Sequence, residues 1–242
     1  MRIIAQKNNT LATEEFIKNS LEKDFINSMS INVTYTKDQK IVVYSAPAPG
    51  SAIANTINAT TLGQLQGYEV ILLDDMLSLL REKTIKKPLY INLAPYNSGI
   101  LSDDNIEEIT KQMNHYVDEL KRILDSYSEL DIYVHSINRS LVTMLKQKLA
   151  NNRIGFAVTG ADINFIDVDY YLLLTTAQND LIIDTLLKSK KEVIVYIYSD
   201  YFLSYLYEHY LGEKSTPYLQ QAFESLSFMG NYPEIIYKVF QK

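Results

Sequence analysis

Few side chains in this sequence could exchange a proton near neutral pH. Cysteine is absent, and the three histidines are His115, His135 and His209. His115 falls within a long amphipathic stretch and His209 in the motif Tyr-Glu-His-Tyr, where a solvated or structurally satisfied histidine is the ordinary interpretation. His135 stands at the end of a short apolar run, so a role at a strand end stays open for it.

The carboxylates occur in clusters whose spacing does not specify a metal site. Asp103-Asp104 and Glu107-Glu108 begin an apolar-periodic segment, which is typical of the solvated first turn of a helix. A loose cation-binding spacing occurs once, but without the Gly-x₅-Glu of a calcium loop it does not predict calcium. Its members are Asp162, Asn164, Asp167 and Asp169.

Tyrosine is frequent, with 19 residues against no tryptophan. One group of tyrosines near the C-terminal end could line a groove, although packing in the core and on the surface is the more ordinary interpretation. Its members are Tyr196, Tyr198, Tyr201, Tyr205, Tyr207 and Tyr210.

Composition limits the class of protein. The 242 residues are 47% hydrophobic, which allows a sizeable buried core. With 23 basic and 29 acidic residues the net charge is −6, and nothing predicts a nucleic-acid partner. No segment has the length and composition of a signal peptide or a transmembrane helix, so we expect a soluble, cytoplasmic domain. A chain from which such a segment had been trimmed would look the same.

The candidate residues must be positioned by short apolar strands that alternate with amphipathic helices. Alternation of this kind, repeated about eight times, predicts an α/β fold with a parallel sheet closed into a (β/α)₈ barrel, as one domain over residues 1–242. Strands are predicted at 2–5, 31–35, 41–44, 89–94, 131–136, 153–158, within 164–174, at 192–198 and 225–229. Helices are predicted from 11 after a cap at Thr10, at 70–77, from 103 or 104 to 127, and at 140–150, 176–188 and 235–240.

Two of these strands predict a hairpin. The runs 31–35 and 41–44 are rich in β-branched and aromatic residues and flank the polar turn Lys-Asp-Gln-Lys. Residues 47–59 follow as a predicted loop rich in Ala, Pro, Ser and Asn. The residues predicted to lie in or against the central sheet are Ile31, Val33, Val42, Ile91, Val134, Val195 and Ile197.

Residues 26–46 resemble the most diagnostic part of the glycerophosphodiester phosphodiesterase family. That part has Glu-x-Asp on a strand, a Thr-Lys-Asp-Gly turn, and an apolar run ending in His-Asp. Here Thr-Lys-Asp at 36–38 keeps the turn and the apolar frame is kept, but Ser-Ile-Asn stands at 30–32 and Ser-Ala at 45–46. Asn-Asn-Thr-Leu at 8–11 and Gly-Asn-Tyr-Pro-Glu at 230–234 resemble two further family motifs, and the resemblance extends from Ile3 to Phe240.

The resemblance implies a phosphodiesterase-like barrel of bacterial lipid metabolism that has lost its site chemistry. The family hydrolyses phosphodiesters to glycerol 3-phosphate and an alcohol, using a divalent cation such as Ca²⁺ or Mg²⁺ on carboxylates and a pair of histidines as acid and base. The matching positions are Gln6 and Ser45 for the histidines, Lys7 for an arginine, and Ser30, Asn32 and Asn92 for the carboxylates.

Two functions follow from these replacements. The favoured hypothesis is a non-catalytic binding or regulatory domain without a metal, whose ligand is a small phosphate or polyol, or whose partner is a protein. The alternative is an active phosphodiesterase with a non-standard site. For the mouth of the barrel we expect a neutral polar cleft of Gln6, Lys7, Ser30, Asn32, Ser45 and Asn92. Lys7 would be a cation with no facing carboxylate, or would point to water while tyrosines close the cleft.

Overall fold

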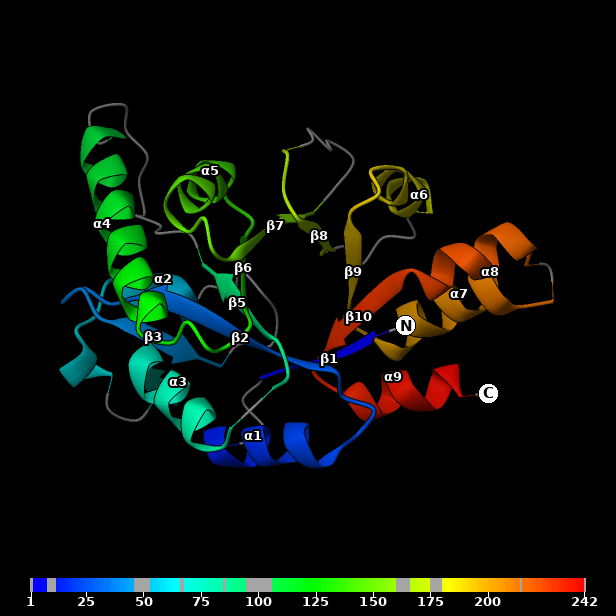
Figure 1. Ribbon diagram of the computed structural model, residues 1–242, viewed down its shortest axis with the longest axis horizontal. Coiled ribbons are helices and arrows are strands. Elements are labelled where there is room, and N and C mark those ends of the chain that lie inside the picture. The colour runs from blue at the N-terminus through cyan, green and yellow to red at the C-terminus, as the bar shows by residue number, and fades with distance from the viewer. Residues whose placement is uncertain are drawn as a thin grey trace.

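The computed structural model describes residues 2–7, 12–45, 53–65, 68–84, 86–94, 106–159, 166–174, 180–213 and 215–241. Its centre is a closed ring of parallel strands with helices around the outside (Figure 1). The ring closes because β1 pairs with both β2 and β10. The barrel strands are β1 (Arg2–Gln6), β2 (Ser28–Tyr35), β5 (Leu89–Leu93), β6 (Ile132–Ser136), β7 (Arg153–Val158), β8 (Tyr170–Leu173), β9 (Glu192–Ile197) and β10 (Leu226–Gly230).

Helices connect most successive barrel strands on the outer side. Within the described residues, the connection from β7 to β8 is the one that contains no helix. The outer helices are α1 (Thr13–Glu22), α3 (Leu73–Glu82), α4 (Ile106–Asp125), α5 (Arg139–Lys148), α6 (Asp180–Lys188), α7 (Asp200–Leu211), α8 (Pro217–Glu224) and α9 (Pro233–Phe240). The predicted (β/α)₈ barrel is confirmed.

The predicted hairpin is also confirmed and extends the sheet beyond the barrel. β2 pairs antiparallel with β3 (Ile41–Tyr44), which pairs in turn with β4 (Val70–Leu72). The prediction of a helix from residue 70 was wrong at its start, because residues 70–72 form β4 and α3 begins at Leu73. All seven residues predicted for the sheet lie in strands, Val42 in the β3 extension.

The predicted loop at 47–59 contains a short helix, α2 (Ile53–Asn58), so this prediction was wrong over those residues. Ala54 and Ile57 of α2 pack against Val42 and Tyr44 of β3. Burial of this apolar face stabilises a helix that local composition does not indicate. A short 3₁₀ turn, η1 (Leu62–Gln64), leads toward β4. The predicted cap at Thr10 lies outside the described residues.

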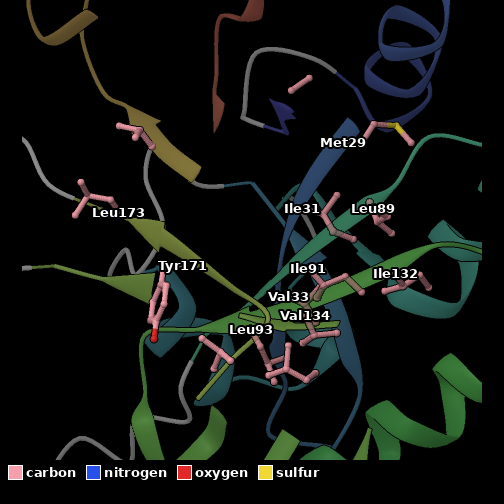
Figure 2. Packing of buried hydrophobic residues seen from close by; sticks show 14 of the residues in the cluster. Met29, Ile31, Val33, Leu89, Ile91, Leu93, Ile132, Val134, Tyr171 and Leu173 are labelled. Atoms are coloured by element: carbon pink, nitrogen blue, oxygen red, sulfur yellow. The ribbon is translucent and has the colours of Figure 1, made fainter. Parts of the chain in front are cut away.

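The barrel has two separate apolar layers. An outer cluster lies between the sheet and the helices, and Figure 2 shows part of it, including Ile31, Val33, Ile91 and Val134. A lumen cluster fills the barrel itself and contains several tyrosines, namely Tyr90, Tyr133, Tyr170 and Tyr196. No helix in the described part of the chain has both the length and the apolar composition needed to cross a membrane.

Candidate functional site

Strand alternation directs polar side chains into the lumen near the carboxyl ends of the strands, here called the mouth. Ile31 and Ile91 belong to the outer cluster that packs against the helices. Because successive side chains on a strand point to opposite faces, Ser30 and Asn32 on β2 and Asn92 on β5 face the lumen. All three are buried.

Register brings these residues beside Gln6. Gln6 is the last residue of β1 and lies opposite Ser30 on β2. Asn32 lies opposite Asn92 on β5, and the Asn92 Nδ2 donates a hydrogen bond of 2.8 Å to the Asn32 Oδ1. Four of the predicted site residues therefore come from three adjacent strands and share one end of the lumen.

His135 joins this group from the next strand. It lies opposite Asn92 in the sheet, and its Nδ1 is 2.9 Å from the Tyr170 hydroxyl. Complete burial lowers the pKa of His135 to about 3, so its imidazole is neutral at physiological pH. Gly155 makes room for this contact, because a Cβ there would lie 2.4 Å from the Tyr170 ring. His135 therefore lies at a strand end beside Asn92, as the hypothesis of a strand-end role requires.

Several buried polar atoms of the mouth have no hydrogen-bond partner among the described residues. They are both amide atoms of Gln6, the Ser30 Oγ, the Asn32 Nδ2 and the His135 Nε2. The four side chains are at most 2% exposed. A buried polar atom without a partner costs about 1 to 3 kcal/mol. This end of the lumen therefore has hydrogen-bonding capacity that the described residues do not use.

Lys7 directly follows Gln6 and is 1% exposed. Its Nζ donates to the Ser45 Oγ at 2.8 Å and forms an ion pair with the Glu69 Oε1 at 2.9 Å. The Ser45 hydroxyl is 3.5 Å from the other Glu69 carboxylate oxygen. Both expectations for Lys7 were wrong, because it neither points to water nor lacks a facing carboxylate. Sequence reasoning did not single out Glu69, which the structure places against Lys7.

The mouth does not suit the divalent cation that the sequence resemblance implies. Among the described residues its donors are amides, hydroxyls and an imidazole, and the described carboxylate at this end, on Glu69, is already paired with Lys7. In the part of the chain that the structure describes, no three His, Cys, Asp or Glu side chains are grouped to hold a metal ion. Calcium and magnesium favour several oxygen ligands with carboxylate charge, which these residues do not provide.

Two carboxylates of the loose cation-binding spacing can be placed, and both already have partners. Asp167 pairs with Lys146 and Lys191, and the Asp169 carboxylate accepts the Ile154 amide at 2.7 Å. Residues 103, 104, 162 and 164 lie outside the described residues. No cation loop is therefore assembled from the parts that can be placed.

The remaining histidines and tyrosines do not converge on the mouth as one group. His115 is an exposed residue of α4 with an edge contact to Tyr35, and His209 stacks on Tyr205 within α7. Of the predicted tyrosine group, Tyr196 faces the lumen, where its hydroxyl donates to the Asn231 Oδ1 at 3.2 Å. The group is thus divided between the lumen and α7.

Comparison with known proteins found solved structures with a similar fold. No family model and no curated protein matches the sequence. Among solved structures, a putative glycerophosphoryl diester phosphodiesterase from Silicibacter pomeroyi is similar, with a TM-score of 0.69, 11% identity, and coverage of 100% of this chain and 93% of that chain. A putative glycerophosphodiester phosphodiesterase from Galdieria sulphuraria has a TM-score of 0.68, 12% identity, and coverage of 100% and 98%.

A third similar structure is a phosphodiesterase from Oleispira antarctica in complex with the product sn-glycerol-3-phosphate. Its TM-score is 0.68 at 12% identity, with coverage of 100% of this chain and 97% of that chain. At such low sequence identity, the similarity shows a shared fold and nothing about function. Over its whole length, this chain has the barrel fold of the glycerophosphodiester phosphodiesterases.

Proposed function

We propose that this barrel has lost phosphodiester hydrolysis and acts as a binding or regulatory domain that holds a small polar molecule at its mouth. The observation that supports this proposal is the set of buried polar atoms on Gln6, Ser30, Asn32 and His135 that have no partner in the described part of the chain. Barrels of this class place their sites at the carboxyl ends of the strands. A ligand, or water in its absence, would supply the missing partners.

The same residues argue against catalysis. General acid–base catalysis needs a group whose pKa lies near the working pH. The pKa of His135 is lowered to about 3 by burial, and amides and hydroxyls do not titrate near neutrality. The described donors also do not suit a divalent cation, so charge on a phosphoryl group would not be neutralised in that way.

An assay of glycerophosphodiester hydrolysis tests the loss of catalysis. Glycerol 3-phosphate release is measured with purified protein in the presence of calcium, magnesium or manganese. We expect no turnover above the blank. A rate above about 1 s⁻¹, which is ordinary for an enzyme, would establish the alternative of an active phosphodiesterase with a non-standard site.

A titration tests the binding role. Glycerol and glycerol 3-phosphate are added to labelled protein, and chemical-shift changes are followed. We expect changes at Gln6, Asn32 and Asn92, with millimolar affinity, or about −4 kcal/mol. Asn32→Ala should weaken binding, whereas Asn151→Ala, an exposed residue ahead of β7, should not. Absence of any shift at the mouth with both probes at tens of millimolar would contradict the proposal.

A further inference from the structure

We infer that Glu69 is a specificity-determining residue, and that it makes the mouth select uncharged polyhydroxylated molecules over phosphorylated ones. This inference rests on the proposed binding function and adds the class of ligand. It depends on two features: the charge state of the Lys7 cluster, and the mixture of donors and acceptors left unpartnered in the lumen.

Lys7 is the natural anchor for an anion, because it is the single lysine or arginine that is buried among the described residues. Its ammonium group is held by the Ser45 hydroxyl and the Glu69 carboxylate at 2.8 and 2.9 Å. An incoming phosphate would have to displace Glu69 or approach while facing its negative charge. The Glu69 side chain is 42% exposed, so water weakens this repulsion without removing it. The ion pair therefore reduces the attraction that Lys7 alone would provide.

A second cation near the strand ends does not replace Lys7. Arg139 begins α5 just after β6, and it is exposed. Its guanidinium lies over the Phe156 ring at 6.0 Å from the ring centre. Phe156 packs with the outer cluster, so Arg139 is associated with the outer side of the sheet.

The polar atoms that have no partner among the described residues could all form hydrogen bonds with the hydroxyl groups of a ligand. The amide nitrogens of Gln6 and Asn32 are donors, and the Gln6 Oε1 is an acceptor. The Ser30 hydroxyl can donate and accept. A phosphate dianion only accepts hydrogen bonds, so the phosphate group itself cannot pair with the Gln6 oxygen, whereas a hydroxyl in its place can. Each hydroxyl of a polyol both donates and accepts, and so can satisfy neighbouring donors and acceptors together.

The test compares glycerol with glycerol 3-phosphate, which differ by the phosphate group alone. In the wild-type protein we expect glycerol to bind at least as tightly as glycerol 3-phosphate. Glu69→Gln keeps the shape of the side chain but removes the negative charge beside Lys7, so glycerol 3-phosphate should bind about tenfold more tightly than to wild type. Affinity for glycerol should stay within about twofold.

Two further variants show whether the gain comes from Lys7. Adding Lys7→Met to Glu69→Gln should abolish the tenfold gain. Glu234→Gln, which removes the carboxylate paired with Lys23 on another part of the barrel, should leave both affinities unchanged. Thermal melts of each variant establish that it is folded before titration.

The outcomes separate this inference from the proposed function. If wild-type protein binds glycerol 3-phosphate tenfold or more tightly than glycerol, the inference about Glu69 is overturned while the binding function stands. An unchanged phosphate affinity in folded Glu69→Gln protein overturns it equally. If wild-type protein binds neither probe, the proposed function fails and the inference fails with it. If Glu69→Gln does not fold, the comparison of glycerol with glycerol 3-phosphate in wild-type protein still tests the inference.

Discussion

The two ends of the barrel lumen treat polar side chains in opposite ways. At the amino ends of the strands, here called the floor, Glu192 pairs with Arg2 at 2.6 Å and with Arg153 at 3.5 Å. The Tyr90 and Ser227 hydroxyls lie 3.3 and 3.4 Å from the same carboxylate. The floor is charged, and its groups are partnered by one another.

At the mouth, the described side chains that face the lumen are uncharged, and only some of their polar atoms have partners. Asn32 and Asn92 share one hydrogen bond, while both polar atoms of the Gln6 amide have none within the described residues. The charged residues described at this end, Lys7 and Glu69, form an ion pair with each other. Buried polar atoms without partners do not stabilise the fold, so the floor contributes more to stability than the mouth does, and the unused hydrogen-bonding capacity of the mouth is the feature on which the proposed binding function rests.

An aromatic layer separates the two ends. Tyr90 packs edge-on against Tyr133 and Tyr170, with ring centres 4.7 and 5.5 Å apart. Burial raises the pKa of Tyr170 well above its ordinary value, so its hydroxyl stays protonated beside His135. These rings lie in the lumen between the mouth and the floor, and we expect a change at one end to have little effect at the other.

The largest expected effect is a pH dependence of the free energy of unfolding, which tests whether His135 at the mouth stays neutral. The pKa of His135 is about 3 in the folded protein and about 6.5 when unfolded, so the unfolded chain binds the proton more readily. The stability that comes from keeping His135 neutral is fully present above pH 6.5 and is lost as the pH falls toward 3. We expect the free energy of unfolding to fall by about 1.4 kcal/mol per pH unit between about pH 6 and pH 4.

Urea unfolding at a series of pH values measures this slope. His135→Gln should remove the His135 part of the slope, whereas His115→Gln, at an exposed histidine, should retain it. An identical slope in His135→Gln protein would mean that the mouth tolerates a charge, and the contrast with the floor would be lost.

The second effect concerns the floor. Glu192→Gln keeps the shape of the side chain but leaves Arg2 and Arg153 without their carboxylate, and we expect a loss of about 2 kcal/mol in the free energy of unfolding. Asp118→Asn removes an exposed partner of Lys148 and should cost no more than about 0.5 kcal/mol. Ligand binding at the mouth should be unchanged in both. Weaker binding in Glu192→Gln protein would show that the aromatic layer does not isolate the ends.

The smallest effect has the opposite sign and belongs to the mouth. Gln6→Met replaces an amide without partners by an apolar side chain of similar length. We expect the free energy of unfolding to rise by about 1 kcal/mol and binding of glycerol to be lost. Chemical denaturation and the titration together measure this exchange of stability for function. A destabilised variant would mean that Gln6 is held by structural water and belongs with the floor as a stability residue.

Local sequence patterns predicted most of the fold. Strands and helices alternate with periods of about 2 and 3.6 residues, and these periods are local properties that survive without knowledge of partners. They predicted the hairpin of β2 and β3 and the helix that forms α3, apart from the first three residues of the predicted helix. Because parallel strands place their carboxyl ends together, the sequence also predicted that Gln6, Asn32 and Asn92 would meet.

Tertiary structure decided the features that local patterns do not encode. Helix α2 depends on the face that β3 offers to Ile57, and β4 was hidden because its apolar run continues directly into α3. The contact of His135 with Tyr170 depends on strand register and on Gly155.

The ion pair of Lys7 with Glu69 shows the same limit most clearly. Its residues are 62 positions apart, and Glu69 lies in no periodic pattern that would mark it as part of a site. The sequence by itself determined the barrel and the uncharged side chains at its mouth. Only the tertiary structure decided that the buried lysine there is neutralised, because the partner of a charge depends on where the chain returns in space.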